Sequence, residues 1–423
     1  MPALGALAAE PLYVLADTAI VGHLGTVQLG GLGIASTVLL TAATAFIFLA
    51  YGTTGAVGRR IGAGDGRGAA HMAVQGLWLA LGLGVLSAAV LALAGPALIR
   101  LLGGEGEVAA NAEVYLRISL LGVPALLVTM AGTGYLRGIQ DARTPLAVAG
   151  ATAVGNLVLQ LVLIEGFDQG IGASALSTVV AQAAGAVVYL VKVRAAARAH
   201  GASLAPDRAA LARLGRIGRD LLVRTAALRL AFGLATAIAA RLGVVPLAAH
   251  QVAFEVTTFL SLVLDALAIA GQSLVSTDLG AGSSPRARAT GRRILWWGLG
   301  AGVVAGALVL AFRVPLAGVF SDDPAVEALT ADLLIWVAVL QPIAGVVFAL
   351  DGILIGAGDL GYLARAMSVV AVGFGVLALV VLQADLSILW LWAALAAMLF
   401  GRLVPLLARF HRGRWAVVGM EHP

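Results

Sequence analysis

The sequence contains no cysteine and few charged residues. Without cysteine, a disulfide framework, a thiolate metal site and a cysteine nucleophile are all excluded. Charged residues make up 12% of the 423 positions and hydrophobic residues 61%, which leaves too little polar surface to cover a water-soluble protein. The composition therefore predicts a membrane protein.

Lysine is also nearly absent, and its one occurrence does not fit a nucleotide site. Lys192 follows Tyr189, Leu190 and Val191, whereas the phosphate-binding loop G-x-x-x-x-G-K-[ST] needs glycine directly before the lysine. No H-E-x-x-H zinc motif occurs among the six histidines. We therefore expect no pump driven by such a loop, no metalloenzyme and no cofactor.

Long apolar runs fill the chain. Because a bilayer core of about 30 Å requires about 20 apolar residues per helix, we expect an all-α protein with about twelve spans. The first run carries Glu10 and Asp17 and has no basic stretch before it, so we expect a spanning helix there rather than a signal peptide. The expected spans are 3–24, 31–57, 72–100, 113–136, 145–165, 170–193, 218–242, 247–276, 290–313, 326–355, 363–383 and 386–409.

Arginine marks one end of the spans. The arginine-rich connections contain Arg59, Arg60, Arg67, Arg143, Arg286, Arg288, Arg292, Arg293 and residues 409–414, whereas the opposite connections carry mainly acids. Positive loops face the cytoplasm, so we expect a multi-pass protein of the inner (plasma) membrane with both termini cytoplasmic. The net charge of +5 is modest, and the basic residues are confined to short segments between the apolar runs. We therefore expect no nucleic-acid partner.

The chain repeats itself. The tetrapeptide IGAG ending at Gly64 recurs as LGAG ending at Gly282, 218 residues later (282 − 64). The same separation relates Gly25 to Gly243, Pro124 to Pro342, Gly134 to Gly352, Gly138 to Gly356 and Asp141 to Asp359. Because six spans per repeat give both halves the same orientation, we expect two pseudo-symmetric six-helix bundles with substrate between them.

These boundaries define the expected domains. The N-terminal lobe is predicted at 1–195, a cytoplasmic linker at 196–216, the C-terminal lobe at 217–410 and a cytoplasmic tail at 411–423.

One motif raises an enzymatic alternative. The tetrapeptide GAGD occurs at 62–65 and 356–359 and matches the GxGD of intramembrane aspartyl proteases. Such an enzyme needs two facing aspartates, whereas Asp65 and Asp359 stand at helix ends and at non-equivalent places in the repeats. We interpret both as turn residues.

Asp17 is the most informative ionisable residue within an expected span. A charge there costs about 2.5–3.5 kcal/mol on insertion scales, so it needs a partner or a function. Glu10 and Tyr13 precede it by seven and four residues and share its helical face. Burial favours the protonated acid, which predicts a proton-exchange site; a purely structural carboxylate is the alternative.

Several segments resemble the multidrug and toxic compound extrusion (MATE) family and its DinF-like branch. They are ADTAIVGHLG at 16–25, GYLRGIQDARTP at 134–145, AAHQVAF at 248–254 and LDALAIAGQSLV at 264–275. The resemblance covers essentially the whole chain. It implies an ion-coupled antiporter in which two six-helix lobes form a V-shaped cavity with alternating access.

The resemblance also implies a cation-coupling network in the N-terminal lobe. Asp17 matches the family's helix-one aspartate, Asn156 begins its N-x-x-x-D pair, and Thr178 matches its helix-six threonine. Gln160 stands where the pair has its second aspartate, so one exchangeable charge is missing. Coupling then rests mainly on Asp17, and protons are favoured over Na⁺, which would also bind at Asp17.

Further polar and aromatic residues are candidates to line the cavity or contact substrate. They are Glu10, Tyr13, Tyr51, Tyr135, Gln182, Glu255, Asp265 and Asp351. Interface anchoring is the usual reason for tyrosine in such proteins. Asp265 and His250 lie in segments that resemble the DinF-like branch, and for both a packing or gating role and contact with the cation stay open. Arg117, Arg224 and Arg229 are the expected counter-charges for buried acids.

The function predicted from the sequence is efflux of small organic, often cationic, compounds by an antiporter that works as a monomer in the bilayer and is driven by H⁺ or Na⁺. Two alternatives stay open. A flippase for lipid-linked precursors would share the architecture but needs a strongly cationic cavity, and an intramembrane enzyme would act without an ion gradient.

Overall fold

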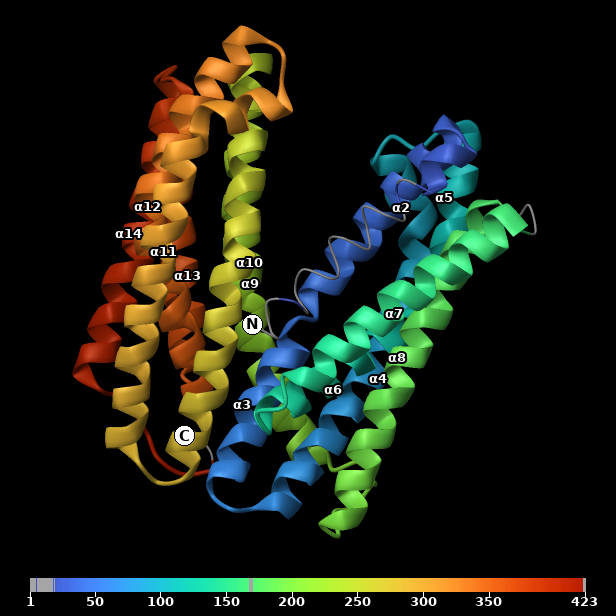
Figure 1. The fold of residues 1–423 in the computed structure, drawn as a ribbon, viewed down its shortest axis with the longest axis vertical. Coiled ribbons are helices and arrows are strands. Elements are labelled where there is room, and N and C mark those ends of the chain that lie inside the picture. The colour runs from blue at the N-terminus through green and yellow to red at the C-terminus, as the bar shows by residue number, and fades with distance from the viewer. Residues whose placement is uncertain (1–4, 6–17, 19, 167–169, 421–423) are drawn as a thin grey trace. The chain divides into compact units, whose positions relative to one another are not determined.

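The computed structural model describes Gly5, Thr18 and residues 20–166 and 170–420, and this part of the chain is α-helical. It divides into two compact units, residues 1–218 and 219–423 (Figure 1). The described residues contain ten helices long and apolar enough to cross a membrane, or eleven if a bent pair counts as one span. The expected first span at 3–24 lies mostly outside the described residues.

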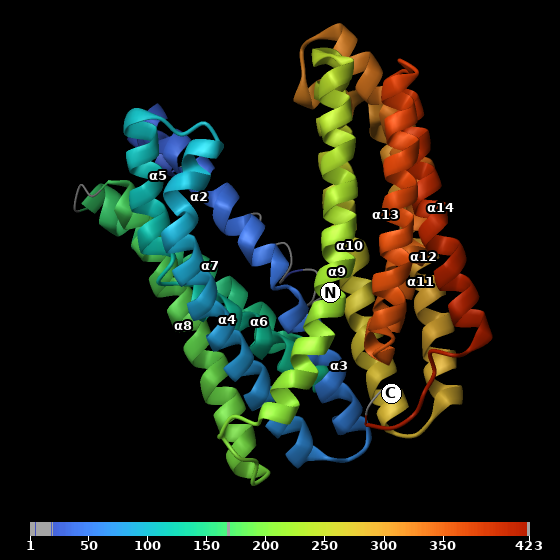
Figure 2. The same cartoon turned by 180° about the vertical axis from the view of Figure 1, so that it is seen from behind.

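Each unit is a bundle of helices, which Figure 2 shows from behind. The first unit contains α2 (Thr26–Ala45), α3 (Phe48–Gly62), α4 (Gly66–Leu101), α5 (Gly106–Ser119), α6 (Val123–Gly138), α7 (Arg143–Leu161), a π-helical turn η1 (Val162–Gly166) and α8 (Ile171–Ala199). Helix α9 (Arg208–Leu242) continues into the second unit, followed by α10 (Val244–Gly280), α11 (Ser284–Phe320), α12 (Pro324–Ala357), α13 (Leu360–Gln383) and α14 (Ile388–Arg412).

The internal repeat is visible in the backbone of both units. Gly25 before α2 and Gly243 before α10 have φ of 134° and 126°. Gly64 after α3 and Gly282 after α10 have φ of 74° and 76°. Glycine adopts such angles without steric strain. The repeated glycines therefore flank equivalent segments of the two halves, α2–α3 in the first and α10 in the second.

Close helix packing repeats at the same separation. A Cβ atom on Gly134 would overlap the carbonyl oxygen of Ala50, and one on Gly352 would overlap that of Ala268. Both glycines and both carbonyls are 218 residues apart in sequence. Because lipid removes the hydrophobic drive for association, spanning helices gain their contact energy by such close approach of backbones.

The two units differ in the continuity of two helices. The expected span at 31–57 breaks between α2 and α3, and the expected span at 113–136 breaks between α5 and α6, where the axis bends by 51°. Their repeat partners α10 and α12 run without interruption. Each of these two expected spans therefore contains a helix break, and Thr26–Gly62 still has the length and composition of one membrane span.

The physical reason for the second break lies in a glycine rather than in the proline. Pro124 follows the break, but its partner Pro342 sits inside the continuous helix α12. Gly122 occupies the break, and its repeat partner is Leu340. Glycine lowers helix propensity by about 1 kcal/mol, and the Gly122 N–H instead donates a short-range bond to the Ser119 carbonyl at 2.9 Å.

The predicted linker at 196–216 is largely helical. Residues 196–199 belong to α8 and residues 208–216 to α9, which leaves 200–207 as the connection between them. The arginines of this stretch therefore lie mostly on helices that extend beyond the apolar runs.

Side chains of α4 hold that connection in place. The Gln75 side chain donates to the Ala205 carbonyl at 2.9 Å and accepts from the Asp207 N–H at 2.8 Å. His71 Nε2 lies 3.2 Å from an Asp207 carboxylate oxygen. Two backbone N–H groups at the start of α9, together with His71, hold the pKa of Asp207 below its usual value. The connection is thus fixed to the first unit.

A substitution on α11 tests the close packing. We expect Gly302→Ala to destabilise the protein by about 1–3 kcal/mol, because the new methyl group would overlap the Gln341 carbonyl oxygen of α12. Gly300→Ala on the same helix is the control, since nothing lies near its Cβ position. Thermal unfolding in detergent compares the two, and equal midpoints would contradict this packing.

Candidate functional site

The buried face of α7 becomes polar toward the C-terminal end of the helix, where Asn156 and Gln160 form what we call the polar stripe. The buried residues of this helix are Pro145, Val148, Asn156 and Gln160, spaced by three, eight and four positions so that they share one face. Asn156 is 2% exposed and Gln160 is fully buried. The π-helical turn η1 follows directly, and such turns are frequent at functional sites. The sequence placed both residues correctly on one face.

Helix α8 brings hydroxyl groups to this stripe. The Asn156 amide nitrogen lies 3.5 Å from Thr178 Oγ1, which itself donates to the Ser174 carbonyl at 3.1 Å. The Asn156 carbonyl oxygen is buried, and no donor among the described residues reaches it. A buried amide acceptor without a donor costs about 1–3 kcal/mol. It is therefore a place where a proton-bearing group or a cation would be stabilised.

A small cavity of about 60 Å³ lies beside Thr178 within the first unit. Its lining includes Ala43 and Phe46 at the α2–α3 break, Ser119 and Val123 at the α5–α6 break, and Gln182 of α8, together with Leu39, Ala42, Ser87, Tyr115 and Leu126. Both helix breaks therefore border the same cavity. This volume is enough for a water molecule.

Gln182 is held directly at one of these breaks. A Cβ atom on Gly122 would overlap the Gln182 side-chain oxygen, so the absence of a side chain at Gly122 admits that amide. The structure thus brings Asn156, Gln160, Thr178 and Gln182 of the prediction onto the facing helices α7 and α8.

The remaining predicted residues of the first unit are distributed differently. Asp17, Glu10 and Tyr13 lie outside the described residues, so their assignment stays a prediction. Tyr51 of α3 is half-buried, and Tyr135 of α6 is 7% exposed.

In the second unit, Asp351 is the predicted acid with the most defined surroundings. Its Oδ2 atom accepts hydrogen bonds from Arg224 of α9 and from Arg402 of α14, the latter at 2.8 Å. All three side chains are buried or nearly so. Two guanidinium groups face one carboxylate, so this cluster carries more cationic than anionic groups and joins α9, α12 and α14.

The expected counter-charges are only partly right. Arg224 pairs with Asp351 as expected, but Arg117 is exposed and pairs with Glu113 one turn earlier on α5. Arg229 is exposed on α9. Arg117 lies in the last turn of α5, near the end of that helix. Arg402 was missed, although a lone arginine inside the apolar run of α14 was a visible signal.

The two predicted acids of α10 are less buried than Asp351 of α12. Glu255 is exposed and Asp265 is half-buried. His250 is fully buried, with its ring 5.8 Å from that of Phe254 and 5.9 Å from that of Trp392, and Thr236 Oγ1 lies 3.4 Å from its Nε2. Of the roles left open for His250, which were packing or gating and contact with the cation, these contacts favour packing.

The two GAGD aspartates have structural partners. Asp65 caps α4 by accepting from the Gly68 N–H at 2.7 Å. Asp359 begins α13 and accepts from Arg409 at 2.6 and 3.0 Å. Both are turn residues, as expected, and each carboxylate is occupied by a bond that stabilises a helix end.

Comparisons with known proteins identify relatives of the whole chain. A family model described as MatE matches residues 2–162 and 223–382. Protein DETOXIFICATION 44, chloroplastic, of Arabidopsis thaliana is 32% identical over 96% of this chain and 79% of its own length. DNA damage-inducible protein F of Escherichia coli (strain K12) is 31% identical over 96% of this chain and 90% of its own.

A solved structure shares the fold. The crystal structure of MATE in the bent conformation has a TM-score of 0.88 at 21% sequence identity, over 99% of this chain and 93% of that one.

The ionic cluster of the second unit predicts a strong stability effect. We expect Asp351→Asn to lower the free energy of unfolding by about 3–5 kcal/mol, because two buried guanidinium groups would lose their anion. Asp332→Asn on the same helix is the control, since that side chain is exposed. Thermal unfolding in detergent is the measurement. If both variants unfolded like the parent, Asp351 would not hold the cluster together.

Proposed function

The chain belongs to the MATE family of multidrug efflux transporters, in its DinF-like branch, and from that premise we propose that it is an antiporter that exports small organic compounds in exchange for protons. The coupling site in this proposal is the polar stripe of the first unit, completed by Asp17. Membership of this family makes the chain a transporter rather than an enzyme.

The proposal rests on the side-chain carbonyl oxygen of Asn156, a buried hydrogen-bond acceptor that no donor among the described residues reaches. This oxygen stands beside Thr178, and Thr178 borders the cavity at the two helix breaks. A protonated carboxylic acid donates one hydrogen bond and an ionised one donates none. Asp17 would therefore fit this environment in its protonated form and lose that bond when it releases the proton.

The ligand chemistry favours protons over Na⁺. A hard cation prefers several oxygen ligands, carboxylates above all. Gln160 contributes a neutral amide where a second carboxylate would complete such a cage, and it cannot exchange a proton itself. In this proposal, coupling therefore rests mainly on Asp17.

The two helix breaks provide the moving part of the proposed mechanism. Protonation of Asp17 from the outside would rearrange the first span near Pro11, and the cavity beside α2 and α5 offers room for this change. The rearrangement lowers the affinity for the organic compound, which leaves to the outside. Return of the transporter to the inward-facing state releases the proton to the cytoplasm.

The membrane potential adds to the driving force of this exchange. Moving one elementary charge across the membrane contributes about 2.3 kcal/mol per 100 mV. Asp351 takes no part in proton exchange in this proposal, because Arg224 and Arg402 already neutralise it. The second unit then acts as the rigid partner of a proton-sensitive first unit.

Transport by reconstituted protein tests the role of Asp17. In proteoliposomes under an imposed proton gradient, we expect Asp17→Asn to reduce efflux of a cationic fluorescent dye to the level seen without a gradient. Glu113→Gln is the matched control, because Glu113 makes only an exposed ion pair.

The same assay separates the competing explanations. A sodium gradient that drives the parent protein equally well would contradict the preference for protons. Undiminished transport by the Asn variant would refute the assignment of Asp17, and equal transport without any gradient would refute active transport.

The acceptor at Asn156 has its own test. We expect Asn156→Leu to lower proton-driven dye efflux by about tenfold or more, because one hydrogen bond to a charged or reacting group is worth about 1.5–3 kcal/mol. Val148→Leu, on the same buried face of α7, is the control for altered packing. Dye efflux at several pH values is the measurement, and equal losses in both variants would assign Asn156 to packing alone.

A further inference from the structure

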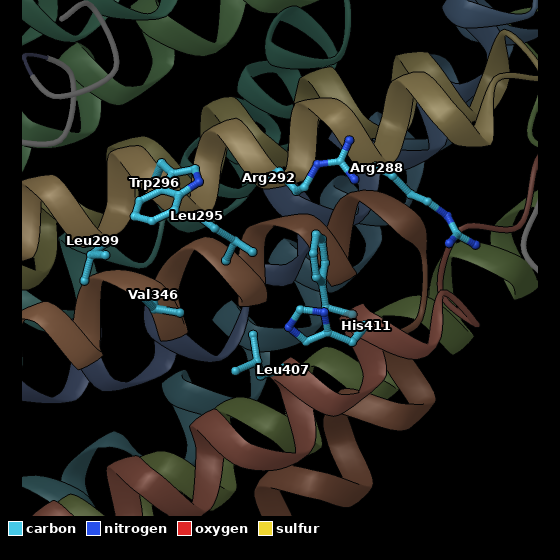
Figure 3. Close-up of a pocket in the computed structure, with 9 residues that line it drawn as sticks. Arg288, Arg292, Leu295, Trp296, Leu299, Val346, Leu407 and His411 are labelled. Atoms are coloured by element: carbon cyan, nitrogen blue, oxygen red, sulfur yellow. The ribbon is translucent and has the colours of Figure 1, made fainter.

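A groove separate from the polar stripe opens in the second unit, between the beginning of α11, the middle of α12 and the end of α14 (Figure 3). Its volume is about 350 Å³, within the range of about 300–1,000 Å³ typical of ligand sites. No acidic residue lines it. Arg288, Arg292 and Trp296 come from α11, and Leu407 and His411 from α14, as Figure 3 shows.

The lining changes from charged to apolar along α11. Arg288, Arg292, Trp296 and Leu299 follow at intervals of four, four and three residues and therefore share one helical face. At 1.5 Å per residue, this face extends for about 17 Å. Two arginines come first, an indole follows, and leucine ends the series. This is the order of polarity that a phospholipid presents from headgroup to acyl chain.

The indole marks the level of the membrane interface. Trp296 and its neighbour Trp297 are 72% and 70% exposed. Exposed tryptophan is enriched where hydrocarbon meets the headgroups. The arginines of the groove then lie at headgroup level in the leaflet at the arginine-rich ends of the helices, and the leucines lie in the hydrocarbon.

The positive charge of the groove is not neutralised within the described part of the protein. Nearby Arg286 is 3.6 Å from Asp278, and Arg409 is bonded to Asp359. By contrast, no carboxylate among the described residues pairs with Arg288 or Arg292, and Arg288 contacts the Gly413 carbonyl at 3.5 Å. Arg288 and Arg292 are exposed, and the planar guanidinium fork of each matches the oxygen atoms of a phosphate group.

The chain's own tail does not fill the groove as far as residue 420. The Gly419 N–H donates to the Leu279 carbonyl at the end of α10, so that part of the tail is directed to a different helix. The apolar wall formed by Leu295, Leu299, Val346 and Leu407 is therefore open to a ligand from the bilayer.

We infer that this groove binds an anionic phospholipid of the adjacent leaflet, with its phosphodiester on Arg288 and Arg292 and one acyl chain along the apolar wall. Both halves of the groove are needed for this assignment. The charged end selects an anionic headgroup over a zwitterionic one, and the apolar end selects a lipid over a soluble phosphate. The inference does not depend on the proposed transport mechanism.

Lipid binding to the purified full-length protein tests the inference. Delipidated protein in neutral detergent is titrated with phosphatidylglycerol, phosphatidylcholine or inorganic phosphate, and bound lipid is counted by native mass spectrometry with thermal unfolding measured in parallel. We expect phosphatidylglycerol to bind and to raise the unfolding midpoint. Equal effects of phosphatidylcholine or of inorganic phosphate would each overturn the assignment.

Two kinds of variant localise the site. We expect Arg288→Gln with Arg292→Gln to weaken phosphatidylglycerol binding by about tenfold or more, since each arginine near an anionic lipid surface contributes on the order of 1 kcal/mol, about fivefold. The control, Arg293→Gln with Arg365→Gln, removes the same charge from exposed positions outside the groove lining. Equal weakening in the two double variants would show unspecific attraction and overturn the assignment.

A steric variant removes the acyl-chain site without changing charge. We expect Leu299→Trp to reduce phosphatidylglycerol binding by a similar factor, because the larger side chain would occupy the apolar end of the groove. Unfolding midpoints of the lipid-free variants report whether each one is folded. Unchanged binding by a folded Leu299→Trp variant would contradict insertion of a chain.

Discussion

The absence of water from the hydrocarbon core is the constraint on which this structure depends. Every polar group in a span must find its partner within the protein. The described residues show this constraint at three levels. Backbone groups are satisfied within helices, the Asp351 carboxylate is held by two arginines, and the helix-end aspartates bind either a backbone N–H or an arginine. Among the described residues, buried side-chain atoms without a hydrogen-bond partner occur in both units, for example the Asn156 carbonyl oxygen on α7 and the Gln341 amide oxygen on α12.

The fold followed from the sequence to a large extent, because its determinants are local or periodic. Apolar runs of sufficient length require helices in lipid, and the separation of 218 residues gave the two-fold repeat, which the glycine φ angles confirm. The helix breaks were not predictable from the same signals. Pro124 and Pro342 are equivalent in sequence, but only the first adjoins a break, since Gly122 weakens the helix there.

The placement of the polar residues of α7 was predictable from their spacing along one helix. Asn156 and Gln160 are four residues apart, so their common burial on α7 followed from helix geometry alone. Charge pairs between distant helices could not be predicted in this way. Arg224, Asp351 and Arg402 come from α9, α12 and α14, and only the folded packing shows that one carboxylate serves two arginines. Arg117 looked equivalent to Arg224 in sequence, but it pairs locally with Glu113.

The repeat also shows where the two halves have diverged. The uninterrupted helices α10 and α12 of the second unit pack closely through glycine, and its acid Asp351 is already bound by cations. The corresponding helices of the first unit are broken, and a cavity lies at both breaks. In the second unit, two arginines bind the Asp351 carboxylate and the equivalent helices are continuous. In the first unit, broken helices with a cavity at the breaks have room to respond to a change of protonation. The divergence of the repeats therefore supports the proposal that the first unit carries the ion-coupling site.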